Sequence, residues 1–592
     1  MIRNFFRFIF STFFWICAFI GVLIFALVLI LYLGHIGPFA PSLKSLKRDS
    51  ILSLTLNGSY VEHANSKGIE SLFLGRNASL YDLTHAILKA SQDEKIKGIL
   101  VRIESPSLGM AQLQELRDAL LSFRKSGKPS WCYSDTFGES SSGTGLYYLA
   151  TACEEIWIQP VGTLNLVGIN METPFAKGAI DKLDIKPEIA QRKEYKTFPE
   201  MFTRDDYSED NREASQAIAD SVLGQIVEGI AKERKISHDR VRLLIASGPY
   251  LTQEALTEKL IDRIDYRNAL ASAIREKLGH HISFVGIGPY LYTKPHEAKG
   301  NKIALIFGSG VIQRDGKSSV LDELMISSNA TYRAFQLAID DKDVKAIVYR
   351  ISSSGGSPIA AETIYSIINY AREHAKKPVI ISMSDTAASG GYWIAVAGSK
   401  IVAQPATLTG SIGVFGGKYV LSGLLEKLGV KVGRVSTSEN ATMWSFTEPF
   451  TPAQWSKLNA IMDEIYEAFS SRVAKGRKMT RDQVEKVARG RVWTGEQALA
   501  LGLVDQLGGF QSAIDLAKQE AGLAHDAGVE IYPRRKTFLE NLVTLFEHDE
   551  EGSSHEAGVL GTFLQPFKKI MAVFRFIQSS EEILYVPLGE VK

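Results

Sequence analysis

The sequence predicts an α/β fold made of two tandem copies of one domain with parallel sheets, preceded by an N-terminal transmembrane helix. Three observations support this prediction. Similar segments recur about 245 residues apart, β-branched runs alternate with segments of helical period, and an uncharged run lies near the N-terminus. The repeat is far longer than a solenoid unit, so it indicates a duplicated domain.

The size and composition agree with a large globular protein. A chain of 592 residues is too long for one hydrophobic core. Apolar residues make up 45% and charged residues 22% of the chain, and the net charge of +1 does not favour nucleic acid as a partner. No CxxC or Cys/His cluster occurs, so we expect no metal site, and no motif calls for a cofactor. Cys132 and Cys153 are interpreted as buried free thiols, although an oxidising compartment would let them pair.

Residues 8–33 hold no charged side chain. A helix of that length spans roughly 39 Å, enough to cross a hydrocarbon core of about 30 Å. The run is longer than the apolar part of a secretory signal and lacks a small-x-small cleavage site. We therefore expect an uncleaved anchor over residues 1–34 and a stalk over 35–50. Basic residues lie on both sides of the span, and their small bias favours a body outside the cytoplasm.

The repeat defines the domain boundaries. Four pairs of segments correspond: residues 97–104 with 345–352, 143–150 with 388–395, 159–160 with 404–405, and 251–262 with 493–505. The first copy is expected over residues 51–290 and the second over 301–533, joined by a linker over 291–300.

Within each copy the periodicity predicts strands followed by helices. Expected strands are 99–103, 346–351 and 378–382, and expected helices are 110–123, 208–236, 359–374 and 452–477. Continuous apolar strands between amphipathic helices indicate βαβ units and a largely parallel, buried sheet. The C-terminal tail over 534–592 is different. It has two apolar segments around an acidic run and is consistent with either a membrane-surface segment or an oligomer contact.

The candidate chemistry centres on a serine and a lysine. Ser411 lies in a glycine-rich turn, where nothing bulky would block a substrate. A serine nucleophile needs a base, yet none of the eleven histidines lies in a glycine-rich turn beside a strand end. A lysine can serve instead if burial lowers its pKa.

Comparison of the copies selects that lysine. When the copies are aligned on their Gln-Pro pairs, Leu166 stands where the second copy has Ser411. The first copy carries Lys196, whereas the corresponding residues 438–450 contain no lysine. Each copy thus holds one half of a Ser–Lys pair, which would form across the interface between the domains.

Ser389 is the rival nucleophile, because it too lies in a glycine-rich turn before a helix-like run. Its counterpart Thr144 also carries a hydroxyl, so this position does not distinguish the second copy from the first. A structural hydroxyl at a helix start would explain it, and Ser411 is preferred. Ser436 and Ser438 are candidates to orient the lysine by hydrogen bonding.

These motifs resemble those of signal peptide peptidase A, the long two-domain form of the bacterial protease IV family. The resemblance runs over about residues 50–530 plus the anchor. It is carried by the Ser-x-Gly-Gly turn at 353–356, residues 388–392 (ASGGY), residues 409–414 (TGSIGV) and Tyr195-Lys196.

The resemblance implies a fold similar to the crotonases and the Clp protease proteolytic subunit. It also implies a serine protease with Ser411 as nucleophile, Lys196 as general base and an oxyanion donor from the Gly355-Gly356 backbone. This chain has Ser354 where the family usually has proline, which would loosen that turn. Further implications are remnant signal peptides or other apolar peptides as substrates, a homotetramer, and a single-pass protein of the bacterial inner membrane with a periplasmic catalytic body.

Two alternative functions remain open at the sequence level. A crotonase-like acyl-CoA enzyme would share the sheet and the oxyanion turn, but it would explain neither the anchor nor the divided Ser–Lys pair. A catalytically inactive membrane scaffold would keep the fold as a binding module. Sequence spacing gives no distance between Lys196 and Ser411, so it does not decide against the scaffold.

Overall fold

The computed structural model describes residues 49–63, 79–291, 300–314 and 325–534. The expected anchor over 1–34 and nearly all of the stalk and of the tail lie outside the described residues. Within the described ranges, no helix has the length and apolarity needed to cross a membrane.

The first copy is built on a six-stranded parallel sheet with the strand order β8-β4-β3-β2-β1-β9. Its strands are β1 (Ser50–Ser59), β2 (Ile96–Ser107), β3 (Ser130–Ser134), β4 (Glu155–Ile158), β8 (Arg263–Ile264) and β9 (Ser283–Gly286). The expected parallel arrangement is confirmed. Strand β3 is wholly buried and β2 is buried along residues 98–101, as continuous apolar strands require.

The second copy repeats this order. Its sheet runs β18-β16-β14-β13-β10-β20, with β15 beside β14 and β19 beside β15. These strands are β10 (Lys302–Ser309), β13 (Val344–Ser353), β14 (Val379–Ala388), β15 (Lys400–Ala403), β16 (Leu408–Gly410), β18 (Val492–Thr494), β19 (Gln506–Leu507) and β20 (Gly528–Ile531). Strands β1, β2, β3, β4, β8 and β9 thus have counterparts in β10, β13, β14, β15, β19 and β20. The antiparallel pair β5 (Thr163–Leu164) with β7 (Tyr250–Leu251) corresponds to β16 with β18.

Helices cover both faces of each sheet. The pair α3 (Leu80–Gln92) and α4 (Met110–Arg124) packs in the main core of the first copy, and α11 (Arg267–Leu278) covers the other face. The second copy places α13 (Ser328–Asp340), α14 (Pro358–Glu373) and α20 (Phe510–Glu520) in the same way. Helix α14 begins where the sequence predicts, because Ser357 caps it and Pro358 takes its first turn.

The remaining helices and strands are shorter, apart from one long helix in the second copy. They are α5 (Thr144–Ala150), α9 (His238–Ser247), α10 (Thr252–Thr257), α12 (Ile287–Leu291), β11 (Val311–Gln313), β12 (Met325–Ser327), α15 (Gly390–Ala395), α16 (Ser422–Lys427), η2 (Glu439–Thr442), α17 (Pro452–Arg477), α18 (Arg481–Val487) and α19 (Gly495–Ala500).

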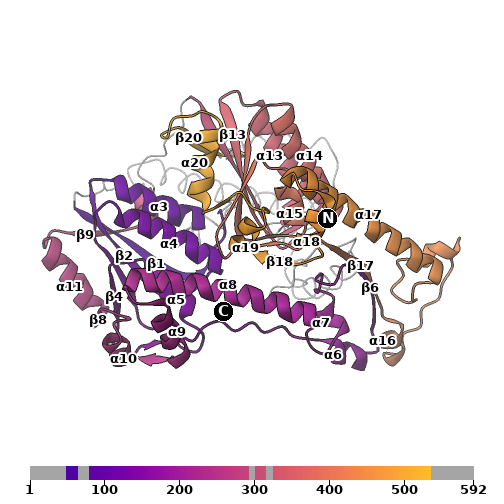
Figure 1. Ribbon diagram of the computed structural model, residues 1–592, viewed down its shortest axis with the longest axis horizontal. Helices are drawn as coiled ribbons and strands as arrows, with labels where there is room; N and C mark the ends of the chain where they lie inside the picture. The colour runs from indigo at the N-terminus through magenta and orange to yellow at the C-terminus, as the bar shows by residue number, and fades with distance from the viewer. Residues whose placement is uncertain (1–48, 64–78, 292–299, 315–324, 535–592) are drawn as a thin grey trace, which may run out of the picture.

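A long excursion of the first copy reaches the second. It comprises α6 (Lys177–Lys182), β6 (Lys186–Arg192) and α7 (Glu200–Thr203), and α8 (Glu209–Arg234) returns the chain to the first copy (Figure 1). Strand β6 pairs antiparallel with β17 (Val414–Val420) of the second copy, so that Arg192 lies opposite Val414. The two copies are therefore joined by a shared two-stranded sheet, immediately before Lys196 and immediately after Ser411.

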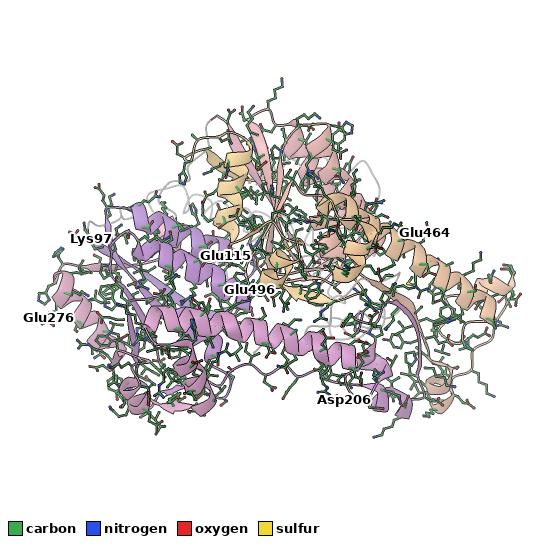
Figure 2. All side chains as sticks on the ribbon, viewed as in Figure 1. Lys97, Glu115, Asp206, Glu276, Glu464 and Glu496 are labelled. Carbon is green, nitrogen blue, oxygen red and sulfur yellow. The ribbon has the colours of Figure 1, made fainter. Side chains whose placement is uncertain are left out.

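A buried group of charges also joins the copies. The Arg350 guanidinium on β13 donates to the carboxylate of Glu62 at 2.8 Å and to that of Glu115 at 2.6 Å. Glu62 and Glu115 belong to the first copy, and Figure 2 shows Glu115 at the junction of the two halves. Arg350 has 1% of its surface exposed, so both ion pairs are shielded from water.

Candidate active site

Lys196 lies in the turn that follows β6, and its side chain is fully buried. The neighbouring Tyr195 N–H donates to the carbonyl of Arg489 in the second copy at 3.1 Å. Gly490 allows this close approach. A Cβ at Gly490, whose φ is +85°, would lie 2.4 Å from the backbone nitrogen of Lys196. The lysine backbone is thus held against the second copy at a position that only glycine can provide.

The amine of Lys196 contacts two serines of the second copy. Its Nζ lies 2.8 Å from Ser389 Oγ, 3.0 Å from Ser411 Oγ and 3.2 Å from the Ser411 carbonyl oxygen. All three contacts are buried. The structure therefore brings together Lys196 and Ser411, as the comparison of the copies predicts, and adds Ser389 to them.

Burial lowers the pKa of Lys196 to about 7. The ordinary lysine pKa is near 10.4, where the amine is almost fully protonated at neutral pH. Among the described residues no carboxylate pairs with this amine, and burial is the cause of the shift. A substantial fraction of the amine is therefore uncharged at neutral pH and can accept a proton.

Ser389 occupies a strained turn between β14 and α15. Its φ of +55° and ψ of −119° lie outside the helical region, and its N–H donates to the Gly410 carbonyl at 2.8 Å. Its hydroxyl makes no capping hydrogen bond to α15. Capping, the structural role that the sequence suggests for Ser389, is therefore not observed. The ψ of −119° sets Ser389 apart from Lys235 and Lys478, which have positive φ as ordinary left-handed helix C-caps.

Ser411 follows β16 and also has a positive φ, of +50°. Its N–H donates to the Arg491 carbonyl at 2.7 Å, and the Gly490 N–H donates to the carbonyl of Ile412 at 2.8 Å. The segment that holds Ser411 is therefore bonded to the same loop that receives Lys196. Both the carbonyl and the hydroxyl of Ser411 face the lysine amine.

The glycine turn after β13 lies beside Ser389. A Cβ on Gly390 would lie 3.2 Å from the Gly356 nitrogen. The Gly355 N–H donates to Ser353 Oγ at 3.1 Å, and Ile312 bonds to the Gly355 carbonyl and to the Ser357 N–H. None of these bonds uses the Gly356 N–H. The bonds to Ile312 hold the turn in place without the proline that the family usually has.

Ser436 and Ser438 do not reach the lysine. Both are exposed, in the loop before η2, whereas Lys196 is buried. The hydrogen bonds of Lys196 Nζ go to Ser389 and Ser411 instead. The prediction that Ser436 and Ser438 orient the lysine is wrong, because the loop after β17 runs over the surface.

Sequence reasoning missed Gly490 as part of the site. Its only sequence signal was a glycine between two arginines, which is an ordinary turn. Tyr392 and Trp393 lie in the core, since the Tyr392 hydroxyl donates to the Leu503 carbonyl and Trp393 stacks on Phe469.

Comparison with known proteins identifies the chain. Peptidase family S49 matches it twice, over residues 122–280 and 371–524. "Protease 4" of Salmonella typhi is 34% identical over 458 residues, covering 75% of this chain and 72% of that protein. "Serine protease SPPA, chloroplastic" of Arabidopsis thaliana is 30% identical over 502 residues, covering 82% of this chain and 71% of that protein.

These matches define a serine peptidase. The chain belongs to peptidase family S49 and carries the family's domain twice. Among solved structures, the ClpP1 N165D mutant from Listeria monocytogenes aligns with 36% of this chain and 94% of its own, at 15% identity and a TM-score of 0.23. So low a score does not test the expected likeness to the Clp protease subunit.

Proposed function

We propose that this chain is a membrane-anchored serine endopeptidase that uses a Ser–Lys pair to cleave apolar peptides, including remnant signal peptides. The observation that carries the proposal is the buried amine of Lys196, which lies within 3.0 Å of two serine hydroxyls and has no acidic partner in the part of the chain that the structure describes. A lysine in this setting is suited to remove a proton from a hydroxyl.

The geometry favours Ser389 as the nucleophile and Ser411 as the residue that holds the lysine. A neutral amine has two N–H donors and one lone pair. The Ser411 carbonyl accepts only and so uses one N–H, and we assign the second N–H to the adjacent Ser411 hydroxyl as acceptor. The lone pair is then left for the O–H of Ser389, at 2.8 Å. This assignment reverses the preference drawn from the sequence.

The position of the oxyanion donors agrees with that assignment. The Gly356 nitrogen lies beside Gly390, the residue that follows Ser389, and we assign its N–H as a donor to the oxyanion that attack by Ser389 would form. In acylation, Ser389 Oγ bonds to the carbonyl carbon while its proton passes to Lys196 Nζ. The amine of the leaving peptide takes up that proton as the C–N bond breaks. A water molecule then gives a proton to Lys196 and releases the acyl group.

Labelling with a peptidyl phosphonate, followed by mapping of the modified residue, tests the assignment. We expect the adduct on Ser389. Ser389→Ala should abolish both labelling and hydrolysis, while Ser411→Ala should lower kcat but keep residual labelling, because only the hold on Lys196 is lost. An adduct on Ser411 would show that Ser411 is the nucleophile, as the sequence analysis preferred. Absence of any adduct and of any hydrolysis would favour the inactive scaffold.

The remaining parts of the proposal come from the sequence. The uncharged run over residues 8–33 supports an anchor in the bacterial inner membrane, with the catalytic body in the periplasm. We further propose a homotetramer, and domains over 51–290 and 301–533. A crotonase-like acyl-CoA enzyme is less favoured, because thioester chemistry on that fold does not require a buried lysine facing two serines.

A further inference from the structure

The first copy keeps a cavity of about 790 Å³ where the second copy has its candidate active site. The turn that follows β2 lines one side, and residues 136–146, between β3 and α5, line another. Asp385, Ala406 and Leu408 of the second copy complete the wall. The cavity therefore lies between the two copies.

Equivalent residues establish the correspondence. Tyr147 of the first copy bonds the Leu260 carbonyl, just as Tyr392 of the second bonds the Leu503 carbonyl. With these tyrosines matched, Thr144 stands at the position of Ser389 and Leu166 at that of Ser411. The Thr144 hydroxyl accepts from the Val167 N–H at 3.1 Å. The cavity is retained, while Thr144 and Leu166 stand at the positions of the two serines.

The cavity wall is suited to a cationic, partly apolar ligand. Leu113, Val222 and Ile226 supply apolar surface, and Glu104 and Glu139 are exposed at the wall. Serine and threonine hydroxyls line the loop before α5. The described residues that line this cavity include no lysine, arginine or histidine.

Asp385 of the second copy adds a carboxylate to the cavity wall. Its Oδ1 accepts from the Ala111 N–H at the start of α4 at 2.9 Å, and Gly109 leaves room for it, since a Cβ there would lie 1.8 Å from Asp385 Oδ2. Burial raises the pKa of Asp385 to about 6, so the group is mainly ionised at neutral pH. Glu62 and Glu115 pair with Arg350, whereas Asp385 makes no direct bond to that guanidinium within the described ranges and lines the cavity.

We propose that this cavity is a second, non-hydrolytic peptide site, which holds a lysine- or arginine-bearing apolar segment of the substrate away from the scissile bond. This inference rests on the proposed function, because the cavity is a copy of the cleft proposed to bind peptides. Asp385 precedes Ser389 by four residues, about 13 Å along an extended strand. A peptide of about ten residues has the length to reach from one site to the other.

Photo-crosslinking tests binding independently of hydrolysis. The protein is the full chain carrying Ser389→Ala and Ser411→Ala, and the probe is an apolar dodecapeptide with one lysine beside a benzophenone. We expect labelling within residues 104–113 or 136–146. Glu104→Lys with Glu139→Lys should reduce that labelling at least fivefold, as should norleucine in place of the peptide lysine. Glu276→Lys on α11 is the matched control, since Glu276 is exposed and far from the cavity (Figure 2).

Labelling confined to the catalytic cleft, or labelling insensitive to charge reversal, would overturn the proposal. Kinetics give a second readout in the otherwise unaltered enzyme. The double charge reversal should raise KM about tenfold for the lysine-bearing dodecapeptide and leave kcat unchanged, because the lost contact is remote from the reacting atoms. A short peptide without lysine should be unaffected. If the probe labels the cavity of the wild-type protein but the protein hydrolyses no peptide, the proposed function is wrong and the proposed binding site is still supported.

Discussion

Two buried lysines of this chain show what a partner charge does to an amine. Lys302 lies 3.0 Å from Asp341 and 2.7 Å from Glu530, and these carboxylates raise its pKa despite the opposing effect of burial. Lys196 contacts hydroxyls and a carbonyl but no carboxylate of a described residue, and its pKa falls to about 7. This difference is what the proposed role of Lys196 as a base requires.

Peptide hydrolysis should rise with pH through an apparent pKa near 7. Only the neutral amine can accept a proton, and its fraction grows as pH passes the pKa of Lys196. The profile of kcat/KM against pH, measured on the full chain in detergent, reports this group in the free enzyme. Lys196→Met should abolish activity at every pH. A rise centred near 10 would show that the base is a solvated amine.

Replacing Lys196 should also change stability in a pH-dependent way. The pKa is lower in the folded state than in the unfolded state, so the unfolded chain binds more protons between about 7 and 10.5. Folding is therefore least favoured below 7, and its free energy improves as pH rises through that window. We expect Lys196→Met to raise the unfolding midpoint at pH 7, with the difference from wild type shrinking towards pH 10. Equal midpoints at pH 7 would contradict a costly buried amine.

At the scale of elements, the pairing of β6 with β17 and the loop at Gly490 bring the lysine to the serines. Gly490→Ala should cut kcat/KM at least a hundredfold, because the new Cβ would displace the Lys196 backbone while a 1 Å shift of a catalytic group is already severe. Gly429→Ala is the control. Gly429 also has positive φ, of +72°, but open space around its Cβ position. Activities that fall equally in both variants would point to backbone strain rather than to displacement of Lys196.

The sequence predicted most elements because their signals are local. The expected strand at 99–103 lies in β2, and the expected helix at 452–477 matches α17. Parallel pairing was predicted because the strands are continuous apolar runs. Lys196 was predicted by comparing the copies, because the first copy has no serine at the position of Ser411 and the second has no lysine in the segment that corresponds to Lys196. The contact of Ser389 with Lys196 was not predictable in the same way, since Thr144 keeps a hydroxyl there. The prediction for Ser436 and Ser438 was wrong because surface loops vary between the copies, so residues of such loops cannot be matched by comparing the copies.

At the scale of the whole molecule, the Arg350 group holds the two copies together. Arg350→Met should lower the unfolding free energy by about 3–5 kcal/mol, because it leaves Glu62 and Glu115 buried without their cation. Chemical denaturation of the full chain gives the value. Arg481→Met, at an exposed arginine on α18, should change it by less than about 1 kcal/mol. An equally small loss of unfolding free energy for Arg350→Met would mean that Glu62 and Glu115 become protonated when their cation is removed.

The excursion of the first copy has a consequence for biosynthesis. Lys196 and Ser389 are 193 residues apart in the chain, and neither copy alone carries both. At about 5–20 residues per second, a ribosome needs roughly 10–40 s to add that stretch. The proposed pair of Lys196 and Ser389 therefore cannot form until the second copy has been synthesised and has folded against the first.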